Sequence, residues 1–341
     1  MIIKPSPFYY TKMGKAYLGD ASDILPQIDS QSIDLICTSP PFALLRKKAY
    51  GNTDSEEYVE WFMPFAREFA RILKPKGSLV IDIGGSWVKG YPIRSLYHYE
   101  LLIKLCKPKD EGGYGFLLAQ ELYWYNPAKL PTPAEWVTVR RERVKDAVNT
   151  VWWLCLDPHP KSDNRKVLKP YSEDQKRLMK VGYKPNKRPS EHVISNKFGK
   201  DNNGAIPPNI INDIEYKVDK IGDPVVVPVN VISASNTSSN DKYLRLCRKY
   251  DMKPHPARFP KILPEFILNL CTEEYDTVLD PFAGSNMTGH MAEIMNRHWI
   301  AIEKEEDYLK ASKFRFIDDE SHEVNKSVNE QIQEKQILLE I

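Results

Sequence analysis

The chain lacks several features that would place it in a class at once. Its five cysteines occur at irregular spacings with no C-x-x-C pair, which argues against a zinc site or a disulfide framework and for reduced, buried thiols. They are Cys37, Cys106, Cys155, Cys247 and Cys271. No apolar run approaches the roughly eighteen residues of a membrane helix, and no secretion signal precedes the first motif. We therefore expect a cytoplasmic protein with no membrane segment and no metal.

Two common nucleotide-binding loops are also absent. There is no Gly-x-Gly-x-x-Gly stretch of the dinucleotide-binding kind and no Gly-x4-Gly-Lys-Ser/Thr phosphate loop. The formal net charge of the 341 residues is only +2, so overall charge does not argue for a nucleic-acid partner. A small ligand of this chain is therefore expected to be a nucleoside without phosphates, and any DNA-binding surface must be local.

Two loops that follow apolar runs carry the chemistry. In the first, Thr38-Ser39-Pro40-Pro41-Phe42, the prolines remove backbone donors and stiffen the chain, so that carbonyls and an aromatic ring project outward. That arrangement suits a planar amine beside a stacked base. The second, Asp280-Pro281-Phe282-Ala283-Gly284-Ser285-Asn286, precedes a helix predicted over 286–296 and a strand predicted over 298–302, after which comes Glu303. Its small residues let a ligand approach the backbone, and the acid can accept ribose hydroxyls.

The alternation of apolar runs predicts an α/β fold with a doubly wound, mostly parallel sheet. Strands are expected at 15–19, 33–37, 78–83, 277–279 and 298–302, with a last strand pair at 116–125 and 148–154. Helices are expected at 55–73 and 95–106. One face of the first helix carries large apolar residues at helical spacing, which we interpret as core packing against the sheet. These residues are Tyr58, Trp61, Phe62, Phe65, Phe69, Ile72 and Leu73.

With these two loops the chain resembles the amino-group DNA methyltransferases in which the catalytic loop precedes the S-adenosylmethionine loop, the permuted β group. More closely, it is similar to the PvuII-type cytosine-N4 methyltransferases of restriction-modification systems, over nearly its whole length. The stretches that carry this resemblance are 39–44, 47–48, 50–52, 130–131, 148–153 and 255–260. One departure from the broader family is Asn286, where glycine is usual in Phe-x-Gly-x-Gly.

The resemblance implies a Rossmann-like, circularly permuted methyltransferase domain that acts on a flipped base. The hydroxyl of Ser39 and the carbonyl of Pro40 would accept the two hydrogens of the amine, and Phe42 would stack on the base. Asp82, at the end of a neighbouring strand, would orient Ser39 or receive the released proton, or alternatively cap the turn at 84–85. The expected catalytic residues are Ser39, Pro40, Pro41, Phe42 and Asp82.

The resemblance also implies S-adenosyl-L-methionine as the cofactor. Asp20 would reach the adenine amine, Glu303 the ribose, and the segment 255–260 the methionine end. Two alternatives stay open: Asp20 as a helix cap, and Glu303 as a solvated acid before a charged helix. The expected cofactor-binding residues are Asp20, His255, Pro256, Phe259, Asp280, Phe282, Gly284, Ser285, Asn286, Thr288 and Glu303.

A change of composition divides the chain. Between a catalytic half (1–155) and a cofactor-binding half (255–318), residues 156–254 are polar, largely basic and without clear periodicity, and a charged tail follows at 319–341. We interpret the middle segment as an inserted target-recognition region that neutralises phosphates of double-stranded DNA, although a disordered linker would carry similar charge. The expected DNA-binding residues are Lys47, Lys48, Lys184, Lys187 and Arg188.

The sequence therefore predicts a site-specific DNA methyltransferase that modifies cytosine N4 and protects its site from a cognate restriction endonuclease, which shares the site but need not bind. A monomer or a weak dimer is expected. Adenine-N6 transfer is one alternative, although those relatives usually carry Asp or Asn in the place of Ser39. A non-catalytic DNA-binding protein on the same fold is another. Carbon-5 methylation is disfavoured, because it needs a Pro-Cys thiolate and Cys37 lies inside an apparent strand.

Overall fold

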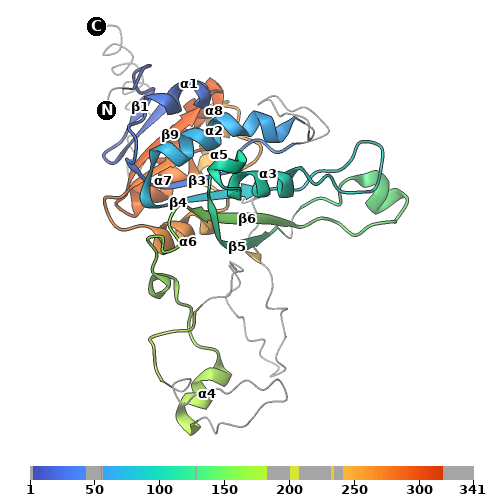
Figure 1. The fold of residues 1–341 in the computed structure, drawn as a ribbon, viewed down its shortest axis with the longest axis vertical. Helices are drawn as coiled ribbons and strands as arrows, with labels where there is room; N and C mark the ends of the chain where they lie inside the picture. The colour runs from blue at the N-terminus through green and yellow to red at the C-terminus, as the bar shows by residue number, and fades with distance from the viewer. Residues whose placement is uncertain are drawn as a thin grey trace.

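A computed structural model describes residues 3–43, 55, 57–126, 129–182, 200–206, 232–233 and 241–317. This part of the chain forms one mixed sheet of nine strands in the order β1-β2-β9-β8-β3-β4-β6-β5-β7 (Figure 1). The strands are β1 (Tyr9–Tyr10), β2 (Gly14–Leu18), β3 (Ile33–Thr38), β4 (Leu73–Ile83), β5 (Leu117–Tyr125), β6 (Val148–Cys155), β7 (Ile232–Ser233), β8 (Thr277–Asp280) and β9 (His298–Glu303).

The centre of the sheet is parallel, as predicted. Strands β2, β9, β8, β3 and β4 pair in parallel, and β6 and β5 continue the sheet in antiparallel pairs. Each predicted strand is present. The largest difference is β4, which begins at Leu73 rather than at residue 78, because Leu73 already pairs with Ile33 as the chain leaves the preceding helix. The circular permutation stays a prediction.

Helices cover both faces of the sheet, which confirms the doubly wound architecture. One face carries α1 (Ala21–Ile24), α2 (Tyr58–Ile72) and α3 (Tyr97–Cys106), and the other α6 (Ile262–Cys271), α7 (Met287–Ile294) and α8 (Glu306–Ser312). Among the residues that the structure describes, no helix is long and apolar enough to cross a membrane. All five cysteines are free thiols.

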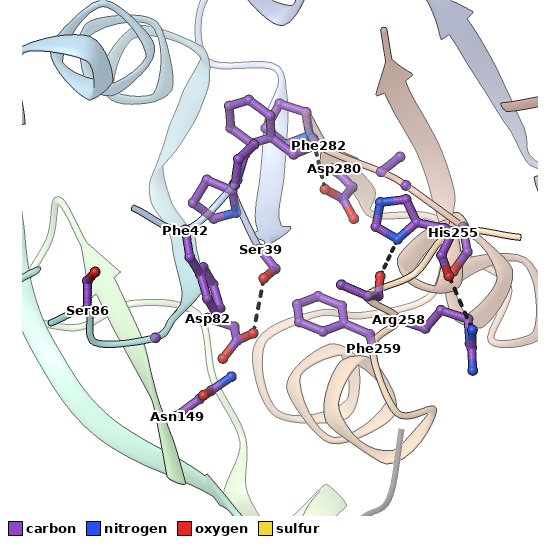
Figure 2. Close-up of a pocket in the computed structure, with 18 of the residues that line it drawn as sticks. Ser39, Phe42, Asp82, Ser86, Asn149, His255, Arg258, Phe259, Asp280 and Phe282 are labelled. Atoms are coloured by element: carbon purple, nitrogen blue, oxygen red, sulfur yellow. Dashed lines mark hydrogen bonds between the residues drawn. The ribbon is translucent and has the colours of Figure 1, made fainter. Parts of the chain in front are cut away.

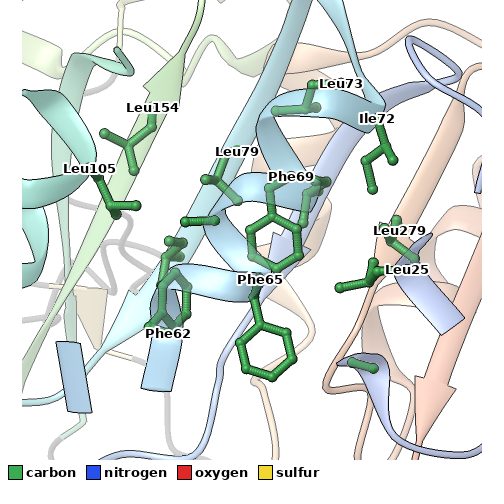
Figure 3. Packing of buried hydrophobic residues seen from close by; sticks show 14 of the residues in the cluster. Leu25, Phe62, Phe65, Phe69, Ile72, Leu73, Leu79, Leu105, Leu154 and Leu279 are labelled. Carbon is green, nitrogen blue, oxygen red and sulfur yellow. The ribbon is translucent and has the colours of Figure 1, made fainter. Parts of the chain in front are cut away.

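The aromatic face of α2 builds the largest of three hydrophobic clusters among the described residues, as its periodicity predicts. Figure 3 shows Phe62, Phe65 and Phe69 of α2 beside Leu79 of β4 and Leu279 of β8. Phe62 and Phe69 are fully buried. Burying an aromatic or aliphatic side chain of this size stabilises a fold by about 2 kcal/mol, so α2 contributes strongly to holding β3 and β4 in place.

The segment 156–254 is more structured at its ends than its composition indicates. Near the start, the Lys161 ammonium pairs with Asp276, and at the end, α5 (Lys242–Lys249) packs through Tyr243 and Cys247 on Phe314. Both ends of the segment therefore contact the sheet domain. Helix α4 (Glu173–Val181) lies well apart from the sheet (Figure 1). The division into units at 156 and 254 stays a prediction.

Candidate active site

The carboxyl ends of the parallel strands meet at one edge of the sheet, beside a cavity of about 1200 Å³. Ser39 follows β3, Asp82 lies near the end of β4, and Asp280 and Glu303 end β8 and β9. Pockets for one small ligand are roughly 300–1,000 Å³. The cavity is therefore large enough for a nucleoside cofactor together with an extruded base.

A hydrogen bond joins the first predicted loop to β4. Ser39 Oγ donates to Asp82 Oδ2 at 3.0 Å, and Figure 2 shows this pair beside Asn149 and Phe42, facing His255 and Phe259 across the cavity. The alternative role for Asp82, capping the turn at 84–85, is not what the structure shows. Because the serine hydrogen points to the carboxylate, the serine lone pairs are available to a donor in the cavity.

Burial raises the pKa of Asp82 to about 7, although hydrogen bonds from Ser39 and Asn149 and the charge of Lys129 oppose the shift. The side chain is 2% exposed, and its Oδ1 atom has no hydrogen-bond partner within the described part of the chain. A carboxyl whose pKa lies near neutral pH can exchange a proton with a reacting group at little cost. The Ser39–Asp82 pair therefore has the chemistry of a proton acceptor.

Tyr97 of α3 connects the end of the first loop to the backbone after β4. Its hydroxyl donates to the carbonyl of Gly84, and the backbone N–H of Ala43 donates back to the same hydroxyl. A Cβ atom at Gly84 would lie 2.6 Å from the Phe42 ring, so only glycine lets that ring pack this closely on the backbone after β4. Tyr97 and Gly84 thus fix the position of the Phe42 ring at the border of the cavity.

The second loop is anchored to the first through Asp280. Thr38 Oγ1 donates to Asp280 Oδ1 at 2.7 Å, and the backbone N–H of Phe282 donates to the same oxygen at 3.2 Å. Burial raises the pKa of Asp280 to about 6 against these bonds. The Phe282 ring meets Phe65 of α2 edge-on at 5.2 Å between centroids and lies 6.0 Å from the Trp61 ring. Trp61 and Phe65, predicted as core residues only, therefore also line the cavity.

Glu303 shapes the second loop from the next strand. Its Oε2 accepts from the N–H of Gly284 at 2.7 Å and its Oε1 from the N–H of Glu305 at 2.9 Å. It is 8% exposed, so it is not a solvated acid. Burial raises its pKa. A carboxylate offers about four acceptor positions, and two remain for a ligand hydroxyl.

The His255 ring packs against the backbone of Gly284 in the second loop. Gly284 has φ +52°, and a Cβ atom there would lie 3.1 Å from the His255 ring. The ring also packs edge-on against Tyr308 at 4.6 Å. Asp20 lines the same part of the cavity and is at the same time the cap of α1, accepting from the N–H of Ser22 at 2.9 Å.

Three predicted cofactor residues do not line the cavity. Pro256 is exposed, and Thr288 lies behind the loop, where its hydroxyl donates to the Cys37 carbonyl at 3.5 Å. Asn286 caps α7 by accepting from the N–H of Gly289, and it donates to the Tyr9 hydroxyl. Its φ of +53° explains the departure from the family's glycine, because Asn tolerates the left-handed region better than most residues.

The other predicted cofactor and catalytic residues line the cavity together. They are Asp20, Ser39, Pro40, Pro41, Phe42, Asp82, His255, Phe259, Asp280, Phe282, Gly284, Ser285 and Glu303. The predicted DNA-binding residues Lys47, Lys48, Lys184, Lys187 and Arg188 lie outside the described residues. In the described ranges no group of three side chains could hold a metal ion.

Sequence reasoning missed two sets of residues. Lys129 lines the cavity and donates to Asn149 Oδ1 at 3.1 Å, which connects it to Asp82. Arg315, 8% exposed, donates to the carbonyl of Ser285 at 2.6 Å and to its hydroxyl at 2.9 Å. The Arg315 guanidinium also lies 4.4 Å from the Tyr243 ring centroid, and the hydroxyl of Tyr243 accepts from the N–H of His255.

Comparison with known proteins assigns the family. A family model described as DNA methylase matches residues 33–314. The type II methyltransferase M.PvuII of Proteus hauseri is 47% identical over 315 residues, which cover 92% of this chain and 86% of that protein. The chain belongs to the DNA methylase family. This methylase is also 26% identical to M.BglII of Bacillus subtilis over 305 residues, which cover 89% of this chain and 69% of the relative.

A solved structure agrees with this assignment. PvuII DNA methyltransferase (cytosine-N4-specific) matches this methylase with a TM-score of 0.71 and 41% identity, covering 94% of this chain and 92% of that one. The predicted resemblance and the predicted Rossmann-like fold are therefore confirmed.

Proposed function

We propose that this methylase transfers the methyl group of S-adenosyl-L-methionine to the exocyclic N4 amine of a cytosine flipped out of duplex DNA. The observation that carries the proposal is the Ser39–Asp82 hydrogen bond, which lies in the same cavity as the loop of Asp280 and Gly284. An acceptor site and a donor site in one cavity are what group transfer between two bound molecules needs. The likeness to the solved PvuII DNA methyltransferase, described as cytosine-N4-specific, supports the choice of substrate.

The residues present fit the cofactor. Gly284 lines the cavity without a side chain, and the buried carboxylates of Asp280 and Glu303 offer negative charge to a cationic ligand. Glu303 would accept hydrogen bonds from the ribose hydroxyls of the cofactor, and Asp20 would accept one from its adenine amine. Phe282 would border the adenine ring. When bound, S-adenosyl-L-methionine supplies an electrophilic methyl group on sulfur.

The first loop would hold and activate the amine. The lone pair of the cytosine amine is delocalised into the ring, so the nitrogen needs hydrogen-bond acceptors that turn the lone pair toward the methyl carbon. Ser39 Oγ, with its own hydrogen held by Asp82, and the carbonyl of Pro40 would accept the two amine hydrogens. As the nitrogen–carbon bond forms and the carbon–sulfur bond breaks, the nitrogen loses one proton, which Asp82 can accept through Ser39.

The choice of base rests on Ser39. Adenine-N6 relatives usually carry Asp or Asn there, whereas a hydroxyl that is itself bonded to a buried carboxylate suits the cytosine amine. Phe42, which packs closely on Gly84 and lines the cavity, would stack on the extruded base.

We also propose the setting in which the reaction occurs. The segment 156–254 would recognise a short, palindromic duplex site between a catalytic half at 1–155 and a cofactor half at 255–318, with 319–341 as a charged tail. A cognate restriction endonuclease would share the site without binding the methylase, which would act as a monomer or weak dimer. Its five free cysteines suit the reducing cytoplasm.

Substitution of Ser39 tests the role of the first loop. Ser39→Ala should lower the turnover of labelled methyl groups into unmethylated duplex DNA by about 100- to 1,000-fold, the usual loss for one preorganised hydrogen-bonding group, and leave cofactor affinity near that of the parent. Ser86→Ala is the matched control, because Ser86 lines the same cavity without a hydrogen bond to Asp82. If Ser39→Ala lowers cofactor affinity and turnover equally, the first loop has only a structural role. If the parent protein transfers no methyl group to DNA, the proposed activity is rejected.

A further inference from the structure

Two loops beside the cavity form a projecting arm, which we define as residues 86–96, after β4, and residues 130–147, between β5 and β6. Both extend away from the sheet in the same direction (Figure 1). The arm contains a π-helical turn at Glu135–Val139. No predicted site residue lies in it.

Arginine side chains hold the two loops of the arm together. Arg94 Nη1 pairs with Asp146 Oδ2 at 2.6 Å, and Arg143 donates to the carbonyl of Pro92. Both guanidinium groups also pack on the Trp87 ring, at 5.3 and 4.3 Å from its centroid. The contacts of Arg94 with Asp146 and of Arg143 with Pro92 and Trp87 cross from one loop to the other, so they hold the two loops against each other.

The arm concentrates positive charge. It carries six basic and three acidic residues, a net charge of +3, whereas the whole chain has +2. Two of the three acids are already paired within the arm, Asp146 with Arg94 and Glu135 with Arg140. Lys89 and Arg141 are exposed and form no ion pair within the described part of the chain. Their charge is therefore directed at solvent or at an anionic partner.

The arm also borders the cavity on the side of the Ser39–Asp82 pair. Trp87, Pro133 and Asp146 line the cavity, and β6 begins directly after the arm and carries Asn149 beside Asp82. A base that reaches Ser39 remains covalently attached to its own sugar and to the phosphates on either side. Those phosphates must pass the rim of the cavity, which the arm forms in part.

We propose that the arm binds the sugar-phosphate backbone of duplex DNA next to the flipped nucleotide, with Lys89 and Arg141 as phosphate ligands. The inference rests on the proposed function and adds a second DNA-contacting surface, separate from the segment 156–254. Phosphate contacts of this kind position the duplex without reading its sequence. The arm would thus hold the backbone on one side while the base leaves the stack.

A paired charge-removal experiment tests the arm. Lys89→Gln with Arg141→Gln should weaken binding of a labelled duplex oligonucleotide by roughly 10- to 60-fold at about 0.1 M salt and lower the slope of log K against log salt by about 2, since each phosphate contact contributes about 0.9. Lys12→Gln with Lys15→Gln removes the same charge at the opposite end of the sheet, where both lysines are exposed, and should change neither quantity. Cofactor affinity should stay at the parent value in both variants.

Equal affinity and equal salt slope in the two double variants would overturn the inference while leaving the proposed function intact. Failure of the parent itself to bind DNA would reject both. If the arm variant loses self-association in sedimentation while its DNA affinity is unchanged, the arm is a protein interface, and the inference is overturned. Should the double variant unfold, Lys89→Gln alone is expected to lower the salt slope by about 1.

Discussion

Asp82 makes opposite contributions to catalysis and to stability, and Asp82→Asn separates them. In the unfolded chain an aspartate has a pKa near 3.8, whereas burial raises the pKa of Asp82 in the fold to about 7. Between these two values the native protein keeps a proton that the unfolded chain has already released. The free energy of unfolding therefore falls as the pH rises through this window. Above about pH 7, the native state carries the full free-energy cost of burying an ionised Asp82.

The magnitude follows from the shift. A difference of about 3 pKa units at roughly 1.4 kcal/mol per unit corresponds to about 4 kcal/mol. Asp82→Asn cannot ionise, so its free energy of unfolding relative to the parent should increase by about 4 kcal/mol between about pH 4 and pH 8. Urea unfolding of both proteins across this range, without cofactor, measures the difference, and other titrating groups cancel.

Activity should change in the opposite direction. The ionised Asp82 is the form that holds the hydrogen of Ser39 and accepts the proton, so kcat/KM of the parent should rise with pH through an apparent pKa near 7, and Asp82→Asn should be nearly inactive throughout. Asp110→Asn, at an exposed site, is the control and should change neither profile. A stability difference that is flat with pH, or a parent kcat/KM independent of pH below about 8, would refute the reasoning.

Three further substitutions test neighbouring parts of the site. Lys129→Met removes a positive charge that lowers the pKa of Asp82, so the acid limb of kcat/KM should move to higher pH; an unmoved limb would rule out this coupling. Glu303→Gln should weaken cofactor binding in calorimetry by roughly 10- to 100-fold, the value of a charge-assisted hydrogen bond, and spare DNA affinity measured without cofactor. Arg315→Met frees Ser285, so it should raise the cofactor dissociation constant more than it lowers kcat at saturation, and a fall in kcat alone would place Arg315 elsewhere in the mechanism.

Local chemistry made part of the site predictable. Ser39 and Asp280 belong to short loops after apolar strands, and parallel strands must bring such loops to one edge of a sheet. Asp82 was recognisable for the same reason, as a lone acid in an otherwise apolar strand. The strands themselves followed from uninterrupted apolar runs, which suit a sheet covered on both faces.

Contacts between distant segments were not predictable from the sequence. Arg315 reaches Ser285 from beyond α8, and Tyr97, the first residue of α3, supports the first loop, yet neither position differs in local pattern from an ordinary residue near the end of a helix. Helix α4 was missed because it has no buried face. Its sequence signals were the Ser172 cap and the pair of Glu173 with Lys176, which local reasoning could have used.

The identity of the methylated base tests the central claim most directly. The parent enzyme is incubated with labelled S-adenosyl-L-methionine and unmethylated duplex DNA, the DNA is digested to nucleosides, and the labelled nucleoside is identified by chromatography and mass. The Ser39–Asp82 arrangement predicts that the label is found in N4-methylcytosine. Label found only in N6-methyladenine, or only in 5-methylcytosine, would contradict the role given to Ser39.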